Sequence, residues 1–225
     1  MSQDARRDLV AAIQAVLGTT PASLNQSSPG SDLYELYVFS LALTAARDLG
    51  AIISFEDVHG NAPTVFVART SPGYIYSDEQ PYCHAVIRLP RCPTLEAHLG
   101  IRVEGASGVL HECDVAVVLQ TEAITCRQGN VQPRQAQVIL AAECKFYTVP
   151  LPLGLARGFV GLTTDLPGRD RYFVFNSTSS NIERFLSVRT RHWERSVRPD
   201  APLEVARLRS AFQMTFRDFT ARRGL

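Results

Sequence analysis

The stretch QVILAAECKFYTV, residues 137–149, decides how this chain is interpreted. It is apolar over nearly its whole length, which is typical of a buried β-strand, and Pro150 ends it. Glu143 and Lys145 interrupt the run, and they share one face of a strand because they alternate with Cys144. Lys145 is also the only lysine of the chain. Charges are costly to bury unless they are paired or bind an ion. The two residues therefore indicate either a stabilising ion pair or a functional site, and we favour the functional site.

A second strand is expected at residues 109–119, VLHECDVAVVL, and it carries Asp114. If the two strands are neighbours, Asp114, Glu143 and Lys145 converge on one face of a sheet. Two carboxylates placed close together repel each other unless a cation lies between them. Mg²⁺ is the ion we expect, with Mn²⁺ able to replace it, because this class of hard ion binds carboxylate oxygens and keeps positions for water and phosphate. A neighbouring lysine can stabilise the charge that develops on a phosphate under attack.

The order of these residues resembles the PD-(D/E)xK phosphodiesterase superfamily, which includes restriction endonucleases, Holliday-junction resolvases and repair nucleases. The resemblance rests on Asp114, a spacer of 28 residues, and Glu143-x-Lys145 at the end of a strand. The expected context agrees over residues 31–198: a helix carrying an acid, a hairpin, the two motif strands, a helix and a further strand. Cys113 stands where the name of the motif has proline, and many members also lack that proline.

The resemblance implies Mg²⁺-dependent hydrolysis of phosphodiester bonds, with Asp114 and Glu143 as metal ligands and Lys145 as the catalytic cation. We expect a DNA endonuclease, of a restriction or anti-phage defence system. Two alternatives stay open: a non-catalytic nucleic-acid-binding or assembly subunit on a nuclease-like scaffold, and an RNase on the same fold. A small nuclease that cuts both strands of a duplex commonly works as a dimer, so we expect a homodimer, or a partner protein that supplies specificity.

Several further residues are weaker candidates for the site. Glu35 is either a third metal ligand or, together with Asp32, the capping box of a helix. Glu112 shares a strand face with Asp114. His111 is expected to be structural, whereas His98 is a remote candidate for an upstream ligand.

An arginine-rich segment provides a candidate nucleic-acid surface. Between residues 171 and 198 the chain has six arginines and two acids, and much of this segment, 182–197, is expected to form a basic helix. Such a helix is either a phosphate-binding face or an ordinary solvated one. The candidate contacts are Arg157, Arg184, Arg189, Arg191 and Arg195.

The remaining pattern predicts an α/β fold, namely a restriction-endonuclease-like mixed β-sheet of four to six strands flanked by helices, with an N-terminal and a C-terminal helix. Helices are expected at 4–17, 32–49, 153–162, 182–197 and 203–221. Strands are expected at 51–55, 64–69 as its hairpin partner, 83–90, 109–119, 137–149 and 171–175. Residues 94–99 are expected to form a helical turn, and 123–128 to pair with a neighbouring strand. The expected organisation is an N-terminal helix and linker (1–30), a nuclease-like core (31–198) and a C-terminal helix packed on it (199–225).

Glycines recur along the helix predicted at 153–162, at Gly154, Gly158 and Gly161. Glycine destabilises a helix by about 1 kcal/mol relative to alanine, so we expect these positions to serve a close approach to the sheet.

Composition limits the other classes of function. The chain has 225 residues, 45% of them hydrophobic and 20% charged, and a net charge of +1. This balance provides no overall attraction to nucleic acid or to an anionic membrane. The five cysteines lack CxxC spacing, so we expect neither disulfides nor a zinc site. No signal peptide or membrane span is expected, and we expect a cytoplasmic protein.

Overall fold

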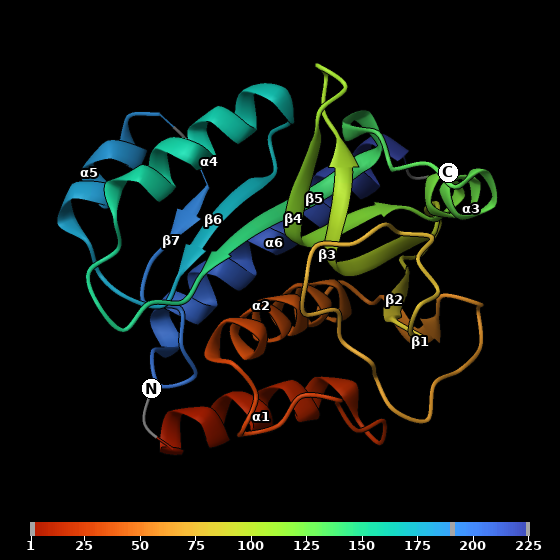
Figure 1. The fold of residues 1–225 in the computed structure, drawn as a ribbon, viewed down its shortest axis with the longest axis horizontal. Helices are drawn as coiled ribbons and strands as arrows, with labels where there is room; N and C mark the ends of the chain where they lie inside the picture. The colour runs from red at the N-terminus through yellow and green to blue at the C-terminus, as the bar shows by residue number, and fades with distance from the viewer. Residues whose placement is uncertain (1–2, 190–191, 224–225) are drawn as a thin grey trace.

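Seven strands form one open mixed sheet in the computed structural model, which describes residues 3–189 and 192–223 (Figure 1). The strands follow the same order in the sheet as in the chain: β1 (Ile52–Asp57), β2 (Cys83–Arg88), β3 (Leu95–Glu104), β4 (Leu110–Leu119), β5 (Val138–Lys145), β6 (Arg171–Phe175) and β7 (Trp193–Glu194). Pairing is antiparallel from β1 to β5 and parallel from β5 to β7. The predicted α/β class with a mixed sheet is confirmed, but the sheet has seven strands and not the predicted four to six.

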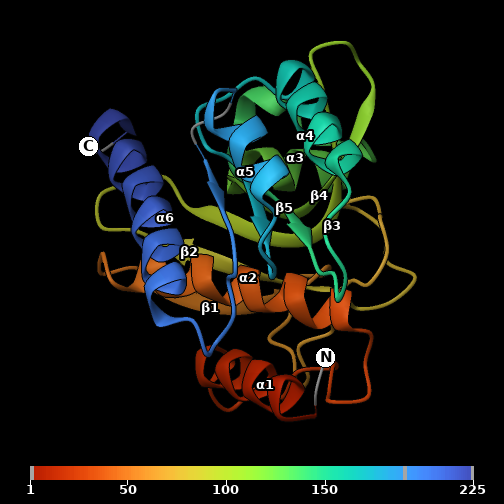
Figure 2. The same ribbon diagram turned by 90° about the vertical axis from the view of Figure 1, so that its left-hand side faces the viewer.

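Helices cover both faces of this sheet (Figure 2). The described ranges contain six α-helices: α1 (Gln3–Leu17), α2 (Gly30–Arg47), α3 (Gln120–Gly129), α4 (Leu153–Asp165), α5 (Ser180–Ser187) and α6 (Pro202–Arg223). Helices α2 and α6 pack on one face, with α1 outside α2, whereas α3, α4 and α5 lie on the other face. The predicted N-terminal and C-terminal helices are confirmed, and no helix within these ranges is long and apolar enough to cross a membrane.

Helix α2 is the centre of the larger hydrophobic core. It is apolar almost all round, which predicts a buried helix, and its buried residues include Tyr34 and Phe39. The predicted cap is wrong, however. The helix begins at Gly30 after Pro29, without a side-chain cap, and Asp32 instead accepts a hydrogen bond from the Ser31 hydroxyl. The capping-box role that was the alternative for Glu35 is therefore excluded.

Helix α6 buries one face, as its sequence predicts. Leu208, Phe212, Phe216 and Phe219 are all buried against the same core as α2. The ring of Phe212 lies 4.8 Å from that of Tyr172 on β6, edge to face. Residues from α1, α2 and α6 thus share one core; the division at residues 30 and 198 stays a prediction.

The predicted hairpin between 51–55 and 64–69 is wrong. The partner of β1 is β2, with Ile53 opposite Ile87. Residues 64–69 instead run beside the linker between α1 and α2, where the Phe66 N–H donates to the Pro21 carbonyl at 2.8 Å. The Phe66 ring is fully buried in the core, which explains why an apolar segment outside the sheet resembles a strand.

Two shorter predictions, one before and one between the motif strands, are also wrong. Residues 94–99 belong to the long strand β3 and not to a helical turn. Residues 123–128 belong to helix α3 and not to a strand. In α3 the buried side chains Ala123 and Cys126 are three residues apart, which is helical spacing. All five cysteines lie within the described ranges and are free, as predicted.

Candidate active site

Strands β4 and β5 are neighbours in the sheet, so the two motif strands lie side by side. Val115 pairs with Ala142, and Asp114 and Glu143 lie one residue beyond that pair. The Lys145 Nζ lies 2.5 Å from Glu143 Oε1 and 3.6 Å from Asp114 Oδ2. The structure therefore brings together the three residues of the motif, at the place where β5 ends.

Asp114 is held more firmly than the other members of this group. Its side chain is 7% exposed, and its Oδ2 accepts a hydrogen bond of 2.6 Å from the Cys144 backbone N–H. Burial, together with the negative charge of Glu143, raises the pKa of Asp114 to about 7. The carboxyl is thus unfavourable as an anion in the protein without a bound cation.

Glu35 and Glu112 add two further carboxyl groups to the same electrostatic group. Glu35 comes from α2, and burial together with the charge of Asp114 raises its pKa to about 8. Glu112 is exposed at the rim, and burial of part of its side chain and the charge of Glu143 raise its pKa. The site therefore has four carboxyl groups for one lysine, which is a surplus of three acids.

This donor set fits a hard divalent cation. Mg²⁺ binds oxygen ligands and is commonly held by one or two carboxylates with water and phosphate in the other positions. Asp114 and Glu143 are the carboxylates nearest to Lys145, and Glu35 is coupled to Asp114 by charge. The raised pKa values show the cost of assembling these acids, and a bound cation removes that cost.

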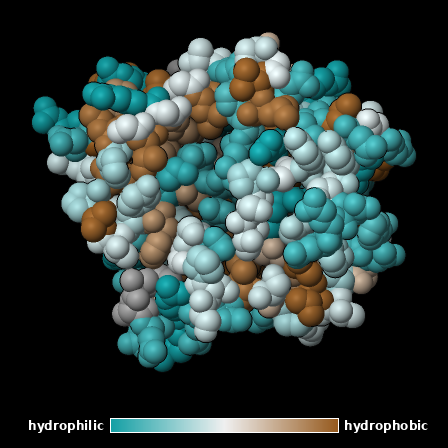
Figure 3. All heavy atoms as spheres, viewed as in Figure 1, coloured by the Kyte–Doolittle hydropathy of each residue, from teal (hydrophilic) through white to brown (hydrophobic). Residues whose placement is uncertain are grey.

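An open groove reaches two members of this group, Glu112 and Glu143. It has a volume of about 370 Å³ and is lined by residues of β4, β5 and α4, including Glu112, Glu143, Gly154 and Gly158. A methyl group added at Gly154, Gly158 or Gly161 would meet no other atom within 4 Å, so the predicted close approach of these glycines to the sheet is wrong. Instead, Gly154 and Gly158 keep one wall of the groove low. Figure 3 shows the middle of this face as hollowed and largely hydrophilic.

A larger cavity, of about 650 Å³, lies between α1, α2 and the segment that follows β5. Phe146 and Tyr147 contribute to its wall, but the acids of the motif do not. Because Glu143 lines the smaller groove, that groove is the better candidate for a substrate path.

No family model, no curated protein and no solved structure matches the chain. The assignment of the site therefore rests on its geometry and on the motif.

The arginines that were expected to form a basic helix do not share one helix. Helix α5 ends at Ser187, and β7 follows beside β6, so the predicted helix over 182–197 is wrong in its second half. Arg157 and Arg184 are exposed on α4 and α5. The Arg189 guanidinium lies over the Phe185 ring at 4.2 Å.

Arg195 pairs with Glu183 at 2.6 Å, so its charge is already partly compensated. Arg191 lies outside the described residues.

Of the two histidine candidates, His111 lines the same groove as Glu112 and Glu143, whereas His98 lies elsewhere. His111 contacts Asp165, with 2.6 Å between Nε2 and Oδ2, and Asp165 also accepts hydrogen bonds from Ser107. These contacts tie the start of β4 and the loop before it to the end of α4. His98 lies on β3 beside Glu96, away from the motif acids.

The sequence interpretation missed His84 and Glu96, which lie with His98 in a buried cluster. A signal was present, because Glu96 and His98 alternate in LEAHL and would share a strand face. Assigning this segment to a helical turn concealed the alternation.

Proposed function

We propose that the chain is a Mg²⁺-dependent phosphodiesterase that hydrolyses nucleic acid, with DNA as the favoured substrate. The observation that carries this proposal is the convergence of Asp114, Glu143 and Lys145, of which Glu143 lines an open groove. A mixed sheet with the motif on two adjacent strands is also what a restriction-endonuclease-like fold of the PD-(D/E)xK type requires. The defence role, the homodimer and the partner protein stay predictions from the sequence.

The surplus of acid supports a metal site over a structural ion pair. A pair that only stabilises the fold needs one carboxylate for the lysine, and a buried pair contributes little compared with apolar side chains. Here Lys145 faces both Asp114 and Glu143, and Glu35 adds a third carboxyl group coupled to Asp114. These carboxyl groups outnumber the lysine, so a second cation would balance their charge.

In this mechanism Asp114, Glu143 and Glu35 would hold Mg²⁺. When bound, the ion polarises the phosphate and lowers the pKa of a bound water. The Cys144 backbone N–H fixes the orientation of the Asp114 carboxylate. A ligand that is anchored in this way needs no rearrangement when the ion arrives.

Lys145 is the cation that remains available to the substrate. Burial opposes its charge, but Asp114 and Glu143 outweigh that effect and raise its pKa above the ordinary value. The ammonium group is therefore charged at neutral pH, and in the reaction it donates hydrogen bonds to the attacked phosphate or to the attacking water. One-fifth of its side chain is exposed, and its ammonium group contacts Glu143, which lines the groove.

The test is a cleavage assay on supercoiled plasmid, single-stranded DNA and RNA with Mg²⁺, Mn²⁺ or Ca²⁺. We expect Mg²⁺ and Mn²⁺ to support cleavage, and we expect Ca²⁺ to bind without turnover because its looser coordination positions water less well. Asp114→Asn should abolish cleavage, whereas Glu104→Gln at the end of β3 should not. Full activity in excess chelator would exclude the metal mechanism, and cleavage of RNA alone would favour the ribonuclease.

A further inference from the structure

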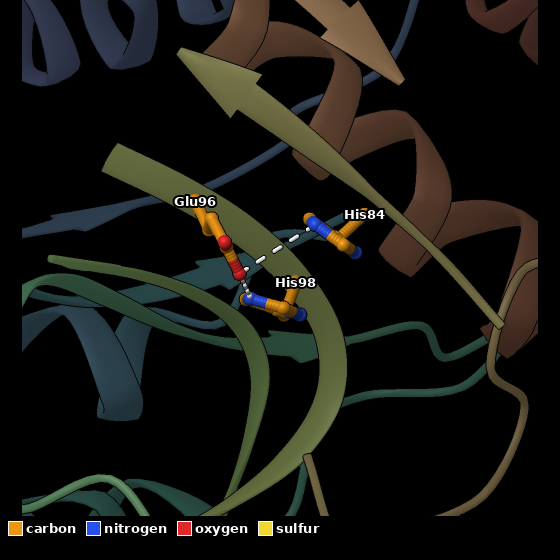
Figure 4. A group of neighbouring side chains, drawn as sticks. All are labelled: His84, Glu96 and His98. Carbon is orange, nitrogen blue, oxygen red and sulfur yellow. Dashed lines mark hydrogen bonds and ion pairs between the residues drawn. The ribbon is translucent and has the colours of Figure 1, made fainter. Parts of the chain in front are cut away.

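A buried cluster of two histidines and one glutamate lies on β2 and β3 (Figure 4). His98 Nε2 is 3.0 Å from Glu96 Oε2, and His84 Nε2 is 3.5 Å from the same oxygen. Figure 4 shows both rings directing a nitrogen toward the Glu96 carboxylate. One ligand atom from each residue lies within 4.8 Å of the other two, so the three side chains converge on one point.

One atom of this cluster lacks a hydrogen-bond partner. The His84 side chain is 4% exposed, and its Nε2 is fully buried with no hydrogen bond. A buried polar atom without a hydrogen bond costs roughly 1–3 kcal/mol, and such atoms in a native fold require an explanation. Because this nitrogen points at the shared carboxylate oxygen, a bound ligand in the cluster would satisfy it.

We propose that His84, Glu96 and His98 bind a divalent transition-metal ion, with Zn²⁺ preferred, at a site separate from that of Asp114. Two imidazoles and a carboxylate form a donor set that suits Zn²⁺. Atoms that surround an ion tetrahedrally at about 2.1 Å lie roughly 3.4 Å from one another. The separations of 3.0 and 3.5 Å from the Glu96 oxygen are close to that value, and all three ligand atoms lie within 4.8 Å of one another, so a modest contraction of the cluster would complete the site.

The surroundings of the cluster resemble the outer shell of a metal site. Arg127 on α3 donates to both oxygens of Glu96 at 2.8 Å and fixes the carboxylate. Hydrogen-bonded partners of this kind orient metal ligands. Glu56 on β1 pairs in register with His84, and its Oε2 lies 4.0 Å from His84 Nε2, so it provides a further carboxylate beside the cluster. Its charge offsets that of Arg127 when a dication binds.

An ion at this position would join the first three strands of the sheet. His84 belongs to β2, Glu96 and His98 to β3, and Glu56 to β1. The side chains are too deeply buried for a substrate to reach them. We therefore assign the ion a structural role that stabilises this end of the sheet.

The experiment titrates chelator-treated full-length protein with Zn²⁺, and in parallel with Co²⁺, by calorimetry and visible absorption. The Asp114→Ala variant serves as the background, because it removes a ligand of the proposed Mg²⁺ site. One equivalent of Zn²⁺ should still bind, Co²⁺ should give the absorption bands of a four-coordinate site, and Zn²⁺ should raise the melting temperature. A folded protein that binds no stoichiometric Zn²⁺ would overturn the site, whatever the result of the cleavage assay.

Substitution of His84 tests whether the ion is bound by this cluster. Affinity for Zn²⁺ should fall in His84→Ala by more than the roughly 10- to 100-fold that removal of an outer-shell partner costs. His59→Ala, at an exposed histidine after β1, is the matched control and should leave affinity unchanged. If His84→Ala does not fold, His84→Asn replaces it. Unchanged Zn²⁺ affinity in the folded variant would place the ion elsewhere and overturn the proposal.

Discussion

The single lysine of the chain faces more negative charge than it can neutralise. Lys145 contacts Asp114 and Glu143, while Glu35 and Glu112 lie within electrostatic range. In the metal-free protein its ammonium group is the counter-ion of the group. In the proposed reaction Mg²⁺ takes over that role and the lysine becomes free to act on phosphate. Removing the lysine therefore tests both states.

Lys145→Met should lower the melting temperature of the metal-free protein, because Glu143 loses an ion pair of 2.5 Å. Mg²⁺ should restore most of that stability, since the ion compensates the carboxylates. Cleavage should still fall by roughly 10²-fold, the scale for removing one preorganised charge from a transition state. Melting with and without Mg²⁺, followed by single-turnover cleavage, measures both effects. Normal cleavage by the folded variant would remove the lysine from the mechanism, and a loss of stability that Mg²⁺ does not restore would favour a structural ion pair.

The raised pKa of Glu35 predicts a pH dependence of stability. Its pKa is 4.5 in the unfolded chain and about 8 in the folded protein, so the folded state binds more protons between these values. The contribution is therefore favourable below about pH 4.5 and is lost as the pH rises to about 8. Without metal, Glu35→Gln should melt higher than the parent protein at the upper end of this range and similarly at the lower end.

Two measurements check the Glu35 prediction. Melting curves across this range, with Glu104→Gln as control, isolate the contribution of Glu35 from that of other titrating groups. Added Mg²⁺ should reduce the difference, because a bound cation stabilises the charged form. A difference between the variants that does not change with pH would show that the carboxyl is not buried among acids.

Among the elements, β4 and β5 could be predicted from the sequence, whereas β3 could not. Each motif strand is a short apolar segment, and the few charged residues within it are therefore easy to recognise. β3 is buried on both faces, and polar Glu96 and His98 lie inward because Arg127 pairs with Glu96. Apolar and polar residues do alternate over LEAHL, but five residues are a short run, which we assigned to a helical turn. The partner on α3 is 31 residues away and cannot be inferred from the strand itself.

The glycines of α4 provide a prediction at the scale of one helix. Gly158→Ala should stabilise the protein by up to about 1 kcal/mol, because alanine favours a helix and its methyl group meets no other atom. Gly158→Phe should instead narrow the groove and raise KM for cleavage. Gly161→Phe is the matched control, since Gly161 lies on the same helix but does not line the groove. Equal kinetics in the two phenylalanine variants would show that substrate does not pass along α4.

At the scale of the whole molecule, contacts between residues far apart in the chain could not be predicted from the sequence. The α/β class and the terminal helices follow from local patterns. The pairing of β1 with β2, across an irregular segment that holds Phe66, depends on contacts between distant residues. The arginines show the same limit: the segment is basic, but a chain reversal after Ser187 separates side chains that a single helix would have aligned.

The separation of the arginines predicts which of them bind nucleic acid. Arg157, Arg184 and Arg189 are exposed, on or beside the helices α4 and α5 that lie on one face of the sheet together with the groove. Arg195 is paired with Glu183. Because each arginine that binds a phosphate releases a counterion, a triple alanine variant of the exposed three should bind DNA more weakly. Its salt slope should be shallower by up to about 0.9 for each phosphate that is no longer neutralised.

The control for this surface is Arg209→Ala on α6, across the sheet, where the guanidinium pairs with Asp48. It should leave both affinity and salt slope unchanged. Arg195→Ala should have a smaller effect than any of the exposed three, because its charge is already compensated. Binding is measured by fluorescence anisotropy over a range of salt concentrations, with Ca²⁺ in place of Mg²⁺ to prevent cleavage. An unaltered slope in the triple variant would make this face an ordinary solvated surface, and the DNA path would then have to follow other charges around the groove.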